Sequence, residues 1–321
     1  MSPPYLRKLT VAIVTYGETN SIIEKCLKSI GSELSNQDRA IIIHEGTEDQ
    51  FRNLVGLVES FQFPFQCLSL DGDGGLSNGR NLAIDKCDTE WIAFIDDDAE
   101  MIPGWRKSFQ RGVDKFPDSA GFTGPLYPIY EDGSKRLPDE MQWIVSCNSF
   151  GSKKDGPVRN GYGANMVFNA LKSKKNSIFF DPSFGAVGGT EGDSLAGEET
   201  IFSMKLRDLT GNDIIWLHDL KVGHNVPRSR TTLSYVLHRS IKEGKTKAIL
   251  GKSNIVKNSR KSSLSKELPH LLRTIFLGIP KQLIQTPLRP VSSLWNIVGI
   301  FLMILGTGWG YLTSGKGRNL I

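Results

Sequence analysis

Four short apolar runs, rich in β-branched residues and separated by helical patterns, constrain the fold of this chain more than any other feature. The runs predict strands at Leu9–Thr15, Ala40–His44, Pro64–Leu70 and Trp91–Ile95, and the patterns between them predict helices at Thr19–Ile30, Phe51–Phe61 and Asn78–Lys86. Strands and helices alternating at this spacing predict βαβ units around a parallel sheet. Strands that are apolar at nearly every position are buried on both faces of such a sheet. We expect Gly31 to end the first helix and Ser77 to cap the third.

Three adjacent carboxylates, Asp96, Asp97 and Asp98, directly follow the fourth predicted strand. Ligands of parallel α/β sheets bind beyond the carboxyl ends of the strands. Adjacent carboxylates repel one another, so a cation would help to hold them together. Oxygen ligands suit Mg²⁺ or Mn²⁺, either of which would also bind a diphosphate. A solvated acidic turn is the alternative, but the buried strand in front favours a site.

A second candidate segment is Gly75-Leu76-Ser77-Asn78-Gly79-Arg80-Asn81, at the start of the third predicted helix. Small residues at a helix start expose backbone N–H groups, and Arg80 adds a forked donor for a phosphate or a base carbonyl. An arginine on the surface of a capped helix is the simpler alternative.

Four stretches together resemble the inverting glycosyltransferases of family 2, which have the GT-A fold. They are VAIVTY at 11–16, IIIHEGTED at 41–49, GLSNGRNLAIDKCDTEWIAFIDDD at 75–98 and GEET at 197–200. The third stretch carries most of the resemblance, because it is close to the family's G-x-S-x-A-R-N, helix, strand and D-x-D pattern. The likeness extends over about residues 8–245.

The resemblance implies an α/β, Rossmann-like GT-A domain that binds a nucleotide-sugar donor and Mn²⁺ or Mg²⁺. It implies a single-sugar, hexosyltransferase-like reaction with inversion onto a hydroxyl acceptor, which would be a glycan, a lipid-linked glycan or a polysaccharide precursor. The implied donor-binding residues are Thr15, Tyr16, Glu18, Glu45, Arg80, Asp96 and Asp97. Asp98 and His224 would bind the metal, Glu199 with Glu198 in reserve would be the general base, and Gly163 and Asn165 would line the acceptor side.

The sequence departs from the family pattern at two places. The second-strand loop reads H-E-G-T where D-D-G-S is usual, and the catalytic pair reads E-E where E-D is usual. The Q-x-x-R-W motif of processive synthases is absent. Two other functions stay open at this point: a nucleotidyltransferase acting on sugar phosphates, and a non-catalytic membrane-bound protein that binds glycans through a degenerate site.

Charge is distributed unevenly along the chain. Residues 1–220 contain 22 Lys and Arg against 32 Asp and Glu, whereas residues 221–321 contain 17 against 2. An acidic body with a basic tail predicts that the tail meets an anionic partner, either nucleic acid or a membrane. No RNA-binding aromatic motif accompanies the basic run from Lys242 to Arg273, so we expect membrane lipids and no nucleic acid.

The tail also contains a charge-free stretch, 291–315, whose apolar part is near the minimum length for spanning a bilayer. Arg289 and Lys316 flank it. A buried C-terminal helix is the alternative, and the sequence leaves open whether the stretch spans the bilayer or lies on it. We expect a catalytic domain over 1–245 and a mainly helical, membrane-associating region over 246–321, with 268–287 as an interfacial helix.

Composition excludes several other classes of protein. Ordinary proportions of hydrophobic (39%) and charged (23%) residues exclude a disordered chain. The four cysteines are scattered and form no C-x-x-C pair, which argues against a zinc site and fits a reducing compartment. We expect no cleaved signal peptide and place the protein at the cytoplasmic face of the membrane.

Overall fold

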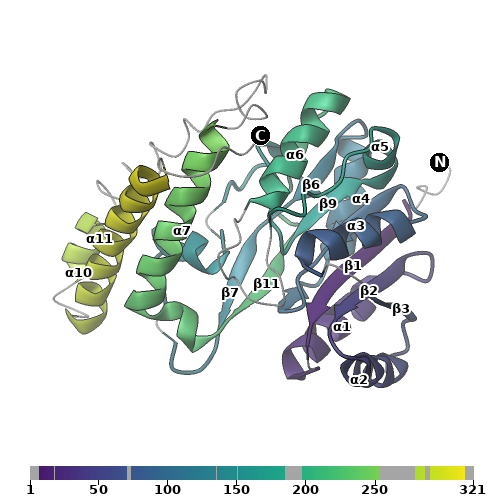
Figure 1. Ribbon diagram of the computed structural model, residues 1–321, viewed down its shortest axis with the longest axis horizontal. Helices are drawn as coiled ribbons and strands as arrows, with labels where there is room; N and C mark the ends of the chain where they lie inside the picture. The colour runs from purple at the N-terminus through teal and green to yellow at the C-terminus, as the bar shows by residue number, and fades with distance from the viewer. Residues whose placement is uncertain are drawn as a thin grey trace. The chain divides into compact units, whose positions relative to one another are not determined.

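The computed structural model describes residues 7–17, 19–70, 74–134, 136–149, 151–184, 197–252, 279–285 and 290–314 (Figure 1). The chain forms two compact units. The first unit comprises residues 1–127 and 151–224, and the second comprises 128–150 and 225–321. The boundary predicted after residue 245 falls inside helix α7 (Leu233–Lys252). This helix belongs to the second unit, where it packs with the C-terminal helices.

The first unit is an α/β fold, as the sequence predicts, but its large sheet is mixed and not wholly parallel. Among the described residues, eight strands form this sheet in the order β3-β2-β1-β4-β9-β6-β10-β8. The strands are β1 (Leu9–Tyr16), β2 (Arg39–Glu45), β3 (Phe65–Ser69), β4 (Trp91–Phe94), β6 (Gly121–Thr123), β8 (Gly156–Val158), β9 (Met166–Asn169) and β10 (Ile214–Trp216). Strands β3, β2, β1 and β4 are parallel, while β9 is antiparallel to both of its neighbours. A second sheet has the order β5-β11-β7, from β5 (Ala99–Met101), β11 (Val222–Val226) and β7 (Leu126–Tyr130).

Helices cover both faces of the large sheet. Successive side chains of a strand point to opposite faces, so the apolar strands place side chains on both faces that need to be buried. Val11 and Ile13 pack with α1 (Ser21–Glu33), α2 (Glu48–Glu59) and α4 (Trp105–Lys115). Ala12 packs on the other face with α3 (Leu76–Lys86), α5 (Ala170–Lys175) and α6 (Glu198–Thr210), which Figure 1 shows together. Both faces of β1, β2 and β4 are therefore buried, as their apolar sequences predict, whereas the edge strand β3 is only partly buried.

Two of the predicted helix boundaries are wrong. Helix α1 continues through Gly31 to Glu33. Helix α3 begins at Leu76 with Gly75 as its N-cap, at φ 109°, so Ser77 lies inside the first turn. The buried Ser77 hydroxyl instead donates to the Phe184 carbonyl at 2.8 Å. Glycine is needed at position 75 because other residues rarely adopt this positive φ.

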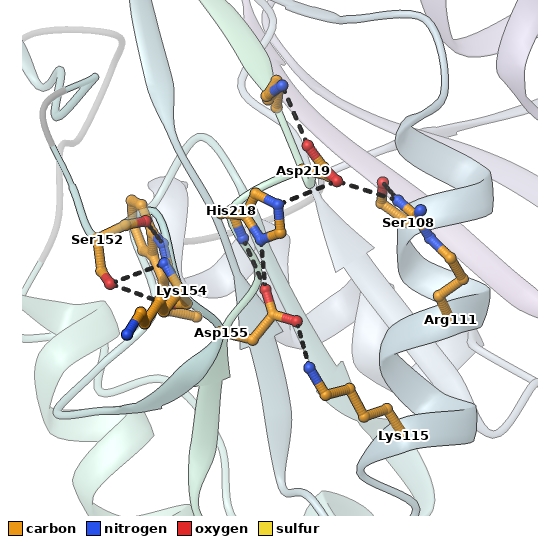
Figure 2. Close-up of polar contacts among 10 residues, drawn as sticks. Ser108, Arg111, Lys115, Ser152, Lys154, Asp155, His218 and Asp219 are labelled. Carbon is orange, nitrogen blue, oxygen red and sulfur yellow. Dashed lines mark hydrogen bonds and ion pairs between the residues drawn. The ribbon is translucent and has the colours of Figure 1, made fainter.

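A polar network joins the segment before β8 to the end of β10 (Figure 2). His218 Nδ1 lies 2.7 Å from Asp155 Oδ1, and its Nε2 lies 3.2 Å from Asp219 Oδ2. Lys115 on α4 also pairs with Asp155, at 2.9 Å. Although partial burial opposes the shift, hydrogen bonds from Lys115 and His218 lower the pKa of Asp155 to about 2. The network fixes this corner of the sheet, and His218 is part of it.

The second unit is mainly helical and has its own apolar core. Its elements are η1 (Asp139–Val145), η2 (Arg228–Thr231), α7 (Leu233–Lys252), α10 (Ile279–Gln285) and α11 (Pro290–Thr313). Met141 of η1, Val236 of α7 and Ile300 of α11 pack in this core. Of the predicted interfacial helix at 268–287, only 279–285 lies within the described residues, and there it forms α10. The side-by-side packing of α7, α10 and α11 is visible in Figure 1.

Glycines bring α7 and α11 into backbone contact. A Cβ added to Gly310 would overlap the carbonyl oxygen of Ile241, and one added to Gly244 would overlap that of Thr307. A Cβ at Gly308, two residues before Gly310 on the same helix, would meet nothing within 4 Å. The helix pair therefore requires glycine at specific positions and not merely a small average side chain.

We predict opposite effects of alanine at two neighbouring glycines. Gly310→Ala forces the two helices apart and destabilises the second unit, with a cost of about 1–3 kcal/mol, as in overpacked cores. Gly308→Ala is the matched control and gains about 0.5–1 kcal/mol from helix propensity. Thermal unfolding of the purified chain checks both. Equal melting temperatures for the two variants would contradict the close packing described here.

Candidate active site

The candidate site lies at the point where the parallel sheet changes direction. The chain moves outward from β1 through β2 to β3 and then returns to place β4 on the other side of β1. In open α/β sheets such a switch point opens a crevice beyond the carboxyl ends of the strands. Thr15 is the last but one residue of β1 and Asp97 follows β4, and Thr15 Oγ1 donates to Asp97 Oδ2 at 2.6 Å. This hydrogen bond joins the two strand ends.

Asp96, Asp98 and His224 form a group that can hold a metal ion. One ligand atom from each lies within 4.8 Å of the others. Antiparallel pairing of β11 with β5 places His224 opposite Ala99 and brings its Nε2 to 3.2 Å from Asp98 Oδ1. Two carboxylates and an imidazole fit a divalent cation. The sequence prediction paired Asp98 with His224 and assigned Asp96 to the donor's ribose or sugar, so it missed Asp96 as a third possible ligand.

Burial raises the affinity of the acidic turn for protons. It raises the pKa of Asp96, although the positive charge of Arg80 opposes the shift. Burial also raises the pKa of Asp97 to about 6, despite the hydrogen bond from Thr15. Ionising this turn is therefore unfavourable without a compensating charge, which a bound cation would supply.

Arg80 links the acidic turn to helix α6. Its Nη1 donates to Glu198 Oε1 at 2.9 Å, and its Nη2 lies 3.4 Å from Asp96 Oδ1. The side chain is 2% exposed, and its guanidinium lies over the rings of Phe94 and Phe180 at 5.9 and 5.4 Å. The sequence predicted a contact between Arg80 and the nucleotide, whereas here the guanidinium joins two carboxylates inside the protein.

The two candidate bases occupy the first turn of α6, after Gly197 at φ 105°. Glu198 is buried, and its two carboxylate oxygens accept hydrogen bonds from Arg80 and from the Gly197 N–H. Glu199 is partly exposed in the same turn. Glu198 is thus buried and hydrogen-bonded through both oxygens, and the greater exposure of Glu199 favours it over Glu198 for contact with an acceptor.

The segment 161–166 (GYGANM) reaches the site through Gly163 and not through Asn165. A Cβ at Gly163 would lie 3.3 Å from Arg80 Nη2 and 4.0 Å from Asp96 Oδ2, so this position borders the ion pair. Asn165 is fully buried, accepts from Trp105 Nε1 and donates to the Leu220 carbonyl. This side-chain amide joins the segment before β9 to α4 and to the segment before β11, and its place on the acceptor side stays a prediction.

The predicted nucleotide-binding residues lie at the carboxyl ends of β1 and β2. Tyr16 is 51% exposed at the end of β1. Glu45 ends β2, and its Oε2 accepts from the Gly75 N–H at 2.8 Å, so this carboxylate organises the start of α3. Glu18 lies outside the described residues.

Residues 10–173, just over half of the chain, match the family model described as Glycosyl transferase family 2. The chain belongs to glycosyl transferase family 2. It is therefore a glycosyltransferase, and the nucleotidyltransferase alternative is wrong. The expected GT-A fold is confirmed by solved structures that match over nearly the whole chain.

One relative and two solved structures of similar fold illustrate the match. The glucosyl-dolichyl phosphate glucuronosyltransferase of Haloferax volcanii is 22% identical over 98% of each chain. The mannosyltransferase PcManGT of Pyrobaculum calidifontis, solved with GDP-Man and Mn²⁺, gives a TM-score of 0.58 at 13% identity, covering 98% of this chain and 89% of that one. S. aureus TarS, solved with UDP-GlcNAc, gives 0.51 at 14% identity, covering 98% and 94%.

Among the described residues, one helical segment, Ser292–Thr313, is long and apolar enough to cross a membrane. It forms nearly all of α11 and coincides with the charge-free stretch of the sequence. This apolar character is consistent with membrane association, but length and composition alone do not distinguish a spanning helix from other apolar helices.

We predict that the acidic turn responds directly to a divalent cation. Mn²⁺ should raise the melting temperature of the wild-type chain, because it neutralises carboxylates whose ionisation is unfavourable. Asp98→Asn should remove this metal-dependent increase and keep the fold. Differential scanning fluorimetry with and without EDTA measures both. Asp219→Asn, in the polar network that follows β10, is the control; an equal Mn²⁺ response in the Asp98 variant would refute the assignment.

Proposed function

We propose that this chain transfers a sugar from a nucleoside-diphosphate sugar to a hydroxyl group of a glycan carried on a polyprenyl-phosphate lipid, with inversion at the anomeric carbon. The observation that carries the proposal is the convergence of Asp96, Asp98 and His224 beside the Arg80–Glu198 ion pair. The residues that could hold a cation and the carboxylates in the first turn of α6 thus lie at the same edge of the sheet. This arrangement supports the binding of a nucleotide sugar there. The Haloferax volcanii relative, named for glucuronosyl transfer to glucosyl-dolichyl phosphate, supports a lipid-linked acceptor.

The donor is proposed to lie across the carboxyl ends of β1, β2 and β4. Tyr16, which is exposed, offers a ring and a hydroxyl to the nucleoside, and Glu18 and Glu45 are proposed to lie near it. Thr15 fixes Asp97 and thereby the backbone of the acidic turn. Asp96, Asp98 and His224 would hold a Mn²⁺ or Mg²⁺ ion, which would supply positive charge to the leaving diphosphate.

Glu199 is proposed as the general base. The acceptor oxygen forms a bond to the anomeric carbon as the bond to the diphosphate oxygen breaks, and the acceptor proton passes to the Glu199 carboxylate. Attack opposite the leaving group inverts the configuration and needs no covalent intermediate. Arg80 and Glu198 act as positioning residues, because they fix the first turn of α6 against the acidic turn.

The protein is further proposed to work at the cytoplasmic face of a membrane, where nucleotide sugars are made and a lipid-linked acceptor is anchored. The apolar α11 and the excess of 17 basic over 2 acidic residues in 221–321 support association with anionic lipid. Nucleic acid is not proposed as a partner.

A direct assay tests the reaction class. The purified chain, with Mn²⁺, is offered UDP- and GDP-sugars and a short-chain polyprenyl-phosphate glycan. We expect stoichiometric release of free nucleoside diphosphate and a glycan longer by one sugar, detected by mass spectrometry. NMR of the new anomeric proton should give the configuration opposite to that of the donor. Diphosphate release without glycan extension, for every donor, would contradict a transfer to this acceptor class.

We predict that the two neighbouring glutamates differ in how they respond to amidation. Glu199→Gln should lower turnover by roughly 10²–10⁴-fold with little change in donor affinity or melting temperature, because it removes the base alone. Glu198→Gln should lower the melting temperature, because it leaves the buried Arg80 with one carboxylate fewer. Steady-state kinetics and thermal unfolding of the two variants separate the roles. A large loss of turnover in Glu198→Gln with normal stability would exchange them.

A further inference from the structure

Helix α11 presents a continuous apolar stripe to solvent. At intervals of three or four residues its exposed side chains are Leu294, Val298, Phe301, Leu305, Trp309 and Leu312. Four of these are more than 60% exposed. The stripe runs about 27 Å along the helix axis, and Leu283 and Ile284 of the adjacent α10 are exposed as well. A contiguous surface of this kind marks an interaction site on a soluble domain.

The opposite face of α11 is fixed against α7. Gly299 approaches Leu233, Gly306 approaches Leu237, and Gly310 meets the Ile241 carbonyl. The contact positions ascend together on the two helices, so the helices run parallel. Close contact along three turns leaves no room for lipid between α7 and α11. The stripe is the face of α11 that α7 does not cover.

Helix α7 carries ionisable side chains along this paired length, and that decides how α11 can meet a bilayer. Arg239 and Lys247 both pair with Glu243, and Lys242 and Lys245 lie between them in the sequence. If α11 crossed the hydrocarbon core with this packing intact, these five residues would be carried into it at a large energetic cost. A helix lying in the plane of the interface keeps them in water.

We propose that the stripe of α11, with Leu283 and Ile284 of α10, docks flat on an anionic bilayer, with α11 parallel to the membrane surface and not across it. The proposal rests on the membrane association proposed above and specifies its mode. Lipid is favoured over a second copy as the occupant because residues 221–321 carry 17 basic against 2 acidic residues, which attracts anionic headgroups and repels an identical surface. Trp309 and Tyr311 sit at one end of the stripe, as aromatic side chains do at membrane interfaces.

Vesicle sedimentation of the full chain tests the docking surface. The wild type should sediment with phosphatidylglycerol–phosphatidylcholine vesicles and stay bound in high salt, since buried apolar side chains are not screened. Phe301→Ser/Leu305→Ser should lower the partition coefficient by more than about tenfold. The matched control is Leu171→Ser/Leu209→Ser, with exposures of 57% and 61% against 52% and 65%, on the first unit. Thermal unfolding verifies that both variants fold.

Depth measurements test the orientation. Nitroxide labels are placed singly by Leu294→Cys, Leu305→Cys and Leu312→Cys in a Cys67→Ser background, because Cys26, Cys87 and Cys147 are buried. Collisional quenching on vesicles should give the three labels a similar, shallow depth. A deep label at position 305 between two shallow ends would overturn the flat orientation while leaving membrane association intact.

Two further outcomes would refute the docking surface. If the serine pair binds vesicles as well as the control pair, the stripe is not the membrane surface. If the wild type is a dimer that ignores vesicles, and the serine pair is a monomer, a second copy covers the stripe. Transfer to a short-chain acceptor in solution is assayed in parallel, so loss of vesicle binding with intact transfer separates failure of docking from failure of the proposed reaction.

Discussion

The candidate site depends on the ion pairs that the guanidinium of Arg80 forms with Asp96 and Glu198. This guanidinium is almost completely buried, and it connects Asp96 beyond β4 with Glu198 in the first turn of α6. A buried cation needs oppositely charged partners close to it, because the free-energy cost of desolvating the cation exceeds the attraction to one distant partner. The ion pairs and the aromatic rings around Arg80 therefore fix two elements separated by about a hundred residues in sequence. Gly163 borders this pair, so the acceptor-side segment is placed by the same contact.

The acidic turn illustrates how a site can be unfavourable for the fold alone. Burial raises the pKa values of Asp96 and Asp97, so their ionised forms are less stable here than in water. The surrounding strands nevertheless keep them in place: Thr15 holds Asp97, and pairing of β11 with β5 brings His224 to Asp98. Strain of this kind is typical of a site that is completed by a ligand with opposite charge.

The two units use glycine for different purposes. Gly75 and Gly197 have positive φ at helix starts beside the site, where other residues would be strained. Gly310 and Gly244 lie in ordinary helical backbone and are required because a neighbouring carbonyl occupies the space of a side chain. The first use shapes a binding edge, while the second brings a charged helix against an apolar one and leaves a single apolar face exposed.

The sequence by itself determined the parallel strands β1 to β4 and the acidic turn after β4. Runs of apolar residues can be buried only in a covered sheet, and the turn is contiguous with its strand. The spacing of the three aspartates also indicates which of them act together. Asp96 and Asp98, two residues apart, lie together near His224, while Asp97 between them accepts a hydrogen bond from Thr15. The family resemblance added His224 and the glutamate pair to this local information.

Only the tertiary structure decided which groups meet. It paired Arg80 with Glu198, engaged Asn165 in packing, and set α11 beside α7. Local sequence patterns depend on neighbours a few residues away, whereas these contacts join positions far apart whose meeting depends on sheet order and helix packing. The sequence leaves open whether the same charge-free stretch spans a bilayer, lies on it or is buried in the protein. This stretch acquires an exposed stripe and a packed face only when a second helix lies along it.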